Sequence, residues 1–163
     1  MIRDPSRLLH GEITNKIIRG YYHVFDALTY GIPDSAFRRA MHIALEDLGL
    51  NFETEVDLPV HFRGQLVGKY RADLIVEKKV IVEIKTAPRT VEAHRDQLFG
   101  YLKIAELEVG LVLNFGPKVE FERYHRSSRT TVPNPNLSSV AAELADAAVP
   151  SEKSGVSVKS KGS

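Results

Sequence analysis

Apolar and polar positions in the first third of the chain alternate with the period of a helix. Apolar side chains recur every three or four residues over two stretches, as they do on one face of an amphipathic helix. Gly31 and Pro33 interrupt the pattern between the two stretches, and Gly49 follows the second at the position where a glycine commonly ends a helix. We therefore predict helices over Glu12–Leu28 and about Asp34–Leu48.

From Phe52 onward the period changes to two, which is typical of strands. A third helical stretch and a nearly continuous apolar stretch follow, and the latter is expected of a strand that is covered on both faces. A helix between two strands implies that these strands pair in parallel. The sequence thus predicts an α/β domain with a central mixed β-sheet and helices on its faces. The predicted strands are Phe52–Phe62, Gln65–Val76, Lys79–Lys85, Val109–Phe115 and Val119–His125, and the third helix is Val91–Leu107.

The composition changes after Arg126, where Ser, Thr, Pro and Asn become frequent. We expect one folded domain over residues 1–126 and a tail over residues 127–163 that is partly disordered. Within this tail, Val140–Ala148 could form a short Ala-rich helix.

Composition and charge exclude several classes of protein. The chain has no cysteine, which rules out disulfides and thiolate metal sites and suits a cytoplasmic protein. No apolar run approaches the roughly 20 residues that span a bilayer, so we expect no membrane contact. The net charge is only +1, so a protein of this kind that binds nucleic acid would need a local basic patch.

The second and third predicted strands form a hairpin that gathers polar residues on one side. With Lys78 at the centre of the turn, Asp73 lies opposite Glu83, and directly opposed Cβ atoms are about 4.5–5.5 Å apart. Strand alternation places Lys85 on the same side as Glu83. The other side is uniformly apolar and carries Ala72, Leu74, Val76, Val80, Val82 and Ile84.

Two carboxylates at this separation repel each other, and one would take up a proton unless a cation lies beside them. Mg²⁺ and Mn²⁺ prefer carboxylate ligands, activate bound water and stabilise charge on phosphoryl oxygens. Lys85 could orient the attacking water or offset phosphate charge. The alternative is that Glu83 and Lys85 form an ion pair on a solvated strand face, because a Glu-x-Lys sequence is common by chance.

Other residues carry two interpretations each. Asp34 is either the N-cap of the second helix or an additional acid near the metal. Gln97 on the third helix either binds water, metal or phosphate or is a boundary residue without a partner. His94 is interpreted as a helix-surface residue rather than a ligand, since no His cluster suggests zinc.

Cations and aromatic residues flank the hairpin and the third helix. Lys69, Arg71 and Arg89 could contact phosphates, as could Arg95, and Tyr101 or Tyr70 could stack on a base. The alternative for each is a solvated charged surface.

Several sequence blocks resemble the GxxExxY proteins, a small bacterial family of the PD-(D/E)XK nuclease superfamily. The resemblance covers roughly Glu12–His125 and is strongest over Tyr70–Val76 with Val80–Lys85; it continues in Gln97–Lys103 and Val109–Phe115. It implies a restriction-endonuclease-like core.

By this resemblance, Asp73 and Glu83 would be metal ligands together with the backbone carbonyl of Ile84. Lys85 would be the catalytic lysine, and Gln97 would be a site residue. The motif that names the family falls on Gly31–Phe37, where Asp34 replaces Glu and Phe37 replaces Tyr. Asp34 is thereby a tentative metal ligand.

We therefore expect a Mg²⁺- or Mn²⁺-dependent hydrolase that cleaves phosphodiester bonds of nucleic acid, with DNA favoured over RNA. The alternative is a catalytically weak or inactive module of the same fold that binds nucleic acid or a protein partner. A third interpretation is an accessory or oligomeric scaffold. No small-molecule cofactor is expected, and the sequence is compatible with a homodimer.

Overall fold

The structure, a computed structural model, describes residues 8–126. Every helix and strand predicted in this range is present, and no boundary differs from the prediction by more than two residues. The predicted tail and its short helix lie outside the described residues, and the domain boundary at Arg126 stays a prediction. The elements are α1 (Gly11–Ala27), α2 (Asp34–Asp47), β1 (Phe52–Phe62), β2 (Gln65–Val76), β3 (Val80–Lys85), α3 (Glu92–Ala105), β4 (Val109–Phe115) and β5 (Val119–His125).

The five strands form one sheet in sequence order, β1-β2-β3-β4-β5. All neighbours are antiparallel except β3 and β4, which are parallel and are joined through α3. The predicted mixed sheet is therefore confirmed. Within residues 8–126, no helix combines the length and apolar character that crossing a membrane requires.

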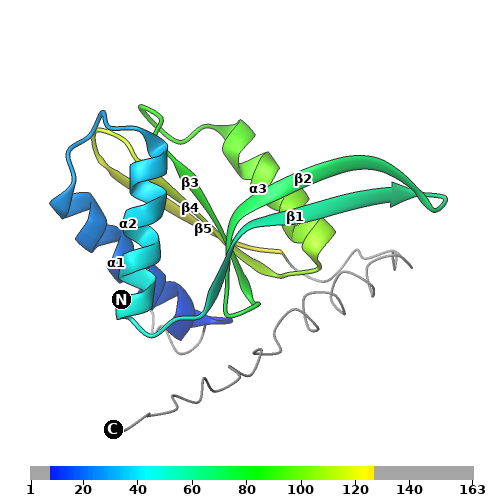
Figure 1. Ribbon diagram of the computed structural model, residues 1–163, viewed down its shortest axis with the longest axis horizontal. Helices are drawn as coiled ribbons and strands as arrows, with labels where there is room; N and C mark the ends of the chain where they lie inside the picture. Colours follow the sequence, from blue (N-terminus) through cyan, green and yellow to red (C-terminus); the bar gives the residue numbers. More distant parts are fainter. Residues whose placement is uncertain (1–7, 127–163) are drawn as a thin grey trace, which may run out of the picture.

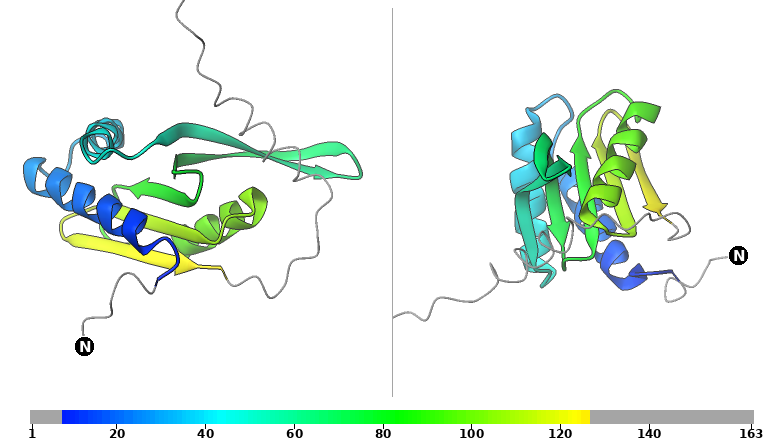
Figure 2. Two further views of the ribbon diagram at one scale, coloured as in Figure 1. Left: turned by 90° about the horizontal axis from the view of Figure 1, so that it is seen from below. Right: turned by 90° about the vertical axis from the view of Figure 1, so that its right-hand side faces the viewer.

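Helices cover both faces of the sheet (Figure 2). On one face, α1 and α2 bury a core in which Tyr21, Phe37 and Phe115 are the largest side chains. On the other face, α3 buries Leu98 and Leu102 against the strands. The polar residues of the β2–β3 hairpin thus lie under a helix rather than on a solvated face.

One prediction about the hairpin is wrong in detail. Ala72 was expected on the same side as Leu74, but it packs in the α3 cluster, whereas Leu74 faces α1 and α2. The change of side occurs opposite Glu55 of β1, whose φ of 50° lies in the left-handed region. An irregular residue of this kind increases the local twist of a strand pair, so the two-residue alternation does not continue past it.

Beyond this point, β1 and β2 continue as a two-stranded ribbon that extends past the rest of the sheet (Figure 1). We call residues 58–72 the β1–β2 ribbon. Its tip is a two-residue turn in which Arg63 and Gly64 both have positive φ, 50° and 77°, as a tight hairpin requires. A shift of register between Val60 and His61 adds twist near the tip.

Candidate active site

The β2–β3 hairpin has the predicted register. Ile75 pairs with Ile81, and the pairing extends from Val76–Val80 at the turn to Leu74–Val82. The next residues along each strand are Asp73 and Glu83, which the register brings together as the sequence predicted.

Side chains take over the hydrogen bonding between the strands at this position. The backbone N–H of Asp73 donates to Glu83 Oε1 over 3.1 Å, and the backbone N–H of Ile84 donates to Asp73 Oδ2 over 2.8 Å. Each carboxylate therefore uses one oxygen to join the two strands. The second oxygens, Asp73 Oδ1 and Glu83 Oε2, accept no hydrogen bond from the described residues at these positions and are the ones available to a further ligand.

Glu83 is almost completely buried, with 2% of its surface exposed. Burial, followed by the charge of Asp73, raises the pKa of the Glu83 carboxyl to about 8, against the lowering effects of the Asp73 N–H, Lys85 and Arg38. Without a further cation, this carboxyl is mostly protonated at neutral pH. The alternative of a solvated strand face is wrong for Glu83 because this side chain is buried, although Lys85 Nζ does lie within ion-pair distance of it, at 3.9 Å.

Lys85 is held by α3 rather than by Glu83. Its Nζ donates to Gln97 Oε1 over 2.7 Å and lies 3.9 Å from Glu83 Oε2. Gln97 Nε2 in turn donates to the Tyr101 hydroxyl over 2.8 Å, so Gln97 is not a boundary residue without a partner. Burial raises the pKa of Tyr101, and the Tyr70 ring lies 6.2 Å from its ring.

Arg38 of α2 is a member of the cluster that sequence reasoning missed. One guanidinium nitrogen, Nη2, lies 2.8 Å from Asp34 Oδ2, and Nε lies 3.6 Å from Asp73 Oδ1. The spacing of four residues between Asp34 and Arg38 was the available signal, but it is equally typical of a surface ion pair on a helix. The N-cap interpretation of Asp34 is wrong: Pro33 occupies the N-cap position, no side chain caps the helix, and the Asp34 carboxylate bonds to Arg38.

The donor set fits a hard divalent cation. Asp73 and Glu83 supply two carboxylates with one uncommitted oxygen each, and Mg²⁺ is commonly held by one or two carboxylates with water completing its shell. Over residues 8–126, no three His, Cys, Asp or Glu side chains gather into one group, so Asp34 does not form a three-acid site with the hairpin carboxylates.

Of the residues predicted to contact nucleic acid, Tyr101 is buried, with 8% of its surface exposed, which does not fit the prediction that its ring stacks on a base. The predicted cations lie on β2, on α3 and in the segment between β3 and α3. Lys69 and Arg71 lie on β2 and both contact Asp57, at 2.9 and 3.0 Å, and both remain more than half exposed. Arg89 is exposed in the segment between β3 and α3. Arg95 is paired with Glu122 at 2.7 Å. His94 is half-buried and accepts a 3.4 Å hydrogen bond from the backbone N–H of Val91.

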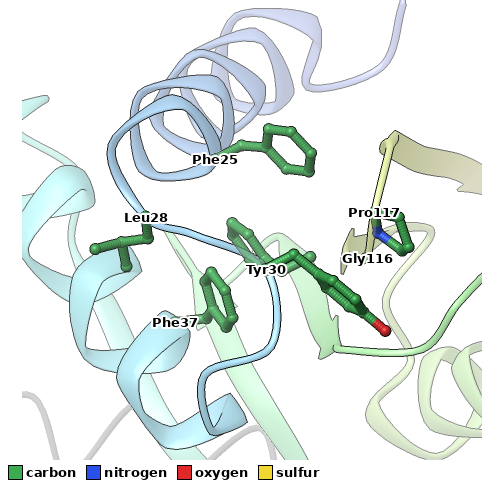
Figure 3. Close-up of a pocket in the computed structure, with 7 residues that line it drawn as sticks. Phe25, Leu28, Tyr30, Phe37, Gly116 and Pro117 are labelled. Carbon is green, nitrogen blue, oxygen red and sulfur yellow. The ribbon is translucent and has the colours of Figure 1, made fainter.

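A separate pocket lies between the α1–α2 loop and the turn after β4 (Figure 3). It has no carboxylate or histidine in its lining, so it lacks the groups that phosphodiester hydrolysis requires. Phe37 is buried here with its ring stacked on Phe115, 4.5 Å between centroids. The lining consists of Phe25, Leu28, Tyr30, Phe37, Phe115, Gly116 and Pro117.

Comparisons with known proteins concern the family and the fold of the chain. The family model described as the PD-(D/E)XK nuclease superfamily matches residues 11–126. Among solved structures, the crystal structure of SSO0001 is similar, with 21% sequence identity and a TM-score of 0.50, over 87% of this chain and 68% of that chain. At this identity the likeness shows the fold alone. No curated protein matches the chain.

Proposed function

Because the chain belongs to the PD-(D/E)XK nuclease superfamily, we propose that it is a metal-dependent nuclease that hydrolyses the phosphodiester bonds of DNA. The observation that carries this proposal is the meeting of Asp73, Glu83 and Lys85 where the β2–β3 pairing ends, with one oxygen of each carboxylate uncommitted. Within the superfamily, we propose membership of the bacterial GxxExxY proteins and, from the lack of cysteine, a cytoplasmic location.

Each residue of the cluster has a chemical role in this proposal. Asp73, Glu83 and the backbone carbonyl of Ile84 would hold Mg²⁺ or Mn²⁺. When bound, such an ion supplies an activated water and stabilises charge on the phosphoryl oxygens. Lys85 carries a positive charge next to the carboxylates and would orient the attacking water or the phosphate. Gln97 holds the Lys85 ammonium in this position through the 2.7 Å hydrogen bond.

The two departures from the family motif lie on α2, outside the β2–β3 hairpin. Phe37, which replaces a tyrosine of the motif, is buried against Phe115 in the α1–α2 core. Asp34, which replaces a glutamate, bonds to Arg38 and does not join a three-acid group in the described part of the chain. The position of Asp34 supports a site in which two carboxylates, rather than three, hold the ion.

The β1–β2 ribbon supports DNA as the substrate. Residues 58–72 contain the cations Arg63, Lys69 and Arg71, and the adjoining Asp57 contacts both Lys69 and Arg71. With Asp57 counted, three positive charges stand against one negative charge, so a chain that is nearly neutral overall carries a local excess of two positive charges here. A two-stranded ribbon fits the major groove of B-form DNA, whereas the deep, narrow major groove of A-form RNA does not admit side chains. Arg71 lies two residues before Asp73 on β2, so a duplex on the ribbon would lie next to the carboxylates. Large apolar side chains are exposed on the ribbon: Phe62, Leu66, Val67 and Tyr70.

The proposal is tested by incubating the purified protein with single- and double-stranded DNA and RNA, with Mg²⁺ or Mn²⁺ and then with EDTA. We expect DNA cleavage that requires the metal and is lost in Asp73→Asn and Lys85→Ala. Lys103→Ala is the matched control, because Lys103 is an exposed lysine on α3. Cleavage that persists in EDTA, or that Lys85→Ala leaves unchanged, would refute the proposed chemistry.

A second candidate is a module of the same fold that binds nucleic acid or a protein partner without cleaving it. The net charge of only +1 and the altered motif, with Asp34 in place of Glu and Phe37 in place of Tyr, motivate this candidate. In that case Asp73→Asn would leave binding untouched, and calorimetry would detect no Mg²⁺ or Mn²⁺ bound at the site. Gel filtration would show whether the protein acts as a homodimer.

A further inference from the structure

We propose that Arg38 is a positioning residue that competes with the divalent cation for Asp73, and that Asp34 holds Arg38 partly away, so that the Asp34–Arg38 pair sets the metal affinity. This inference rests on the proposed function, because it concerns the same metal site. It assigns a role to two residues of α2, of which Arg38 approaches the hairpin and Asp34 contacts Arg38.

The geometry places Arg38 against the oxygen that a metal would use. Asp73 Oδ2 already accepts the N–H of Ile84, which leaves Oδ1 as the free oxygen. Arg38 Nε lies 3.6 Å from this Oδ1. A cation bound to Asp73 through Oδ1 would therefore meet the guanidinium as its neighbour of like charge.

The contact between Arg38 and Asp73 is incomplete. At 3.6 Å the two atoms are too far apart for a hydrogen bond, and Arg38 Nε is buried without any hydrogen-bond partner among the described residues. A buried donor left without a partner is unfavourable, so the guanidinium gains by moving closer to Asp73. What restrains it is Asp34, which holds Nη2 at 2.8 Å from one turn earlier on α2.

This arrangement gives Asp34 and Arg38 opposite effects on metal binding. Removal of the Arg38 charge takes away a repulsive neighbour, and we expect the Mn²⁺ affinity to rise by about tenfold for a partly exposed pair of like charges. Neutralisation of Asp34 releases Arg38 toward Asp73 Oδ1, and we expect the affinity to fall by several-fold. If Asp34 were instead a direct ligand, its removal would weaken binding whether or not Arg38 is present.

The test is isothermal titration calorimetry of Mn²⁺ binding to the full chain without nucleic acid, with wild type, Arg38→Met, Asp34→Asn and the double variant. We expect tighter binding for Arg38→Met, weaker binding for Asp34→Asn, and a change of less than about twofold when Asp34→Asn is added to Arg38→Met. Arg39→Met is the matched control, since Arg39 is the next residue on α2 and is exposed.

Tighter Mn²⁺ binding by Arg38→Met would also show that Arg38 does not serve only to stabilise the fold, because a variant with a damaged fold would bind Mn²⁺ more weakly. Arg38→Gln is a second neutral variant in case Arg38→Met does not fold, and Arg38→Lys, which keeps the charge, should bind Mn²⁺ more weakly than either neutral variant. If wild type binds Mn²⁺ and the Mn²⁺ affinity of Arg38→Met and Arg38→Gln is equal to or lower than that of wild type, the proposed role of Arg38 is overturned. The metal site itself would remain. Absence of Mn²⁺ binding in every variant would overturn the metal site itself, and the role of Arg38 with it.

Discussion

The Lys85 ammonium donates a hydrogen bond to the Gln97 side chain at 2.7 Å, although the carboxylate of Glu83 lies only 3.9 Å away. Without Gln97, the ammonium is free to turn to that carboxylate. We therefore predict that Gln97→Ala lowers the rate of DNA cleavage by about 10- to 100-fold, the range for a misplaced catalytic group. Single-turnover cleavage measures this effect. Asp96→Ala, at an exposed neighbour on α3, is the control, and an equal loss in both variants would contradict a specific role for Gln97.

Lys85→Met separates catalysis from metal binding. If Lys85 stabilises the reacting phosphate or water, we expect the cleavage rate to fall by about 10²- to 10³-fold, while Mn²⁺ binding in calorimetry stays as tight as in wild type or becomes tighter. A parallel loss of metal binding and cleavage would show instead that Lys85 supports the structure of the site.

The raised pKa of Glu83 predicts a pH dependence of stability in the metal-free protein. The folded state keeps this carboxyl protonated up to about pH 8, whereas the unfolded chain ionises it near its ordinary value of 4.5. The folded state therefore binds more protons between these values, and its stability falls as the pH rises through this window. We expect the thermal midpoint to drop from pH 5 to pH 8 in EDTA.

Glu83→Gln, which removes this titration, should flatten that pH profile. Mn²⁺ should raise the midpoint of wild type most at the alkaline end, where binding releases the fewest protons. A profile that is the same in wild type and Glu83→Gln would contradict the assignment.

Gly110 of β4 allows α3 to approach the sheet. A Cβ at this position would lie 2.7 Å from Leu98 Cδ1, closer than packed carbon atoms come. We predict that Gly110→Ala lowers the free energy of unfolding by about 1–3 kcal/mol in urea denaturation, the usual cost of overpacking. The matched control is Gly100→Ala in the middle of α3, where a Cβ has open space, and this change should raise stability by roughly 0.5–1 kcal/mol.

If DNA binds on the β1–β2 ribbon, its affinity should depend on the salt concentration through the cations of the ribbon. If Arg63 neutralises one phosphate, Arg63→Gln should weaken binding to duplex DNA in EDTA and reduce the slope of log affinity against log salt by about 1. Fluorescence anisotropy measures both quantities without cleavage. Arg39→Gln, on α2, should leave them unchanged. An unchanged slope in Arg63→Gln would place the DNA elsewhere on the molecule.

The strand register could be predicted from the sequence because it depends on local information. The turn around Lys78 fixes which residues of β2 and β3 face each other, so Asp73 and Glu83 could be paired before the structure was known. Alternation alone could not show that Ala72 changes sides, because that depends on the irregular backbone of Glu55 in a neighbouring strand.

The burial of Glu83 and the position of Arg38 could not be predicted in the same way. Glu83 is buried because α3 covers that face of the sheet. The sequence of the hairpin does not indicate that a helix packs there. Arg38 approaches Asp73 across 35 residues of chain, and its only local signal is an ordinary spacing from Asp34. The roles of these residues in catalysis stay predictions.

The carboxylates of Asp73 and Glu83 have two tasks, since the same side chains that would bind metal also accept backbone N–H groups between β2 and β3. A related protein without the proposed activity would still need both acids for its fold. Their presence in a related sequence is therefore poor evidence of an active enzyme. The side chains of Lys85 and Gln97 bond to each other and do not join β2 to β3. Their joint presence is therefore the better sign that a related sequence encodes an active enzyme.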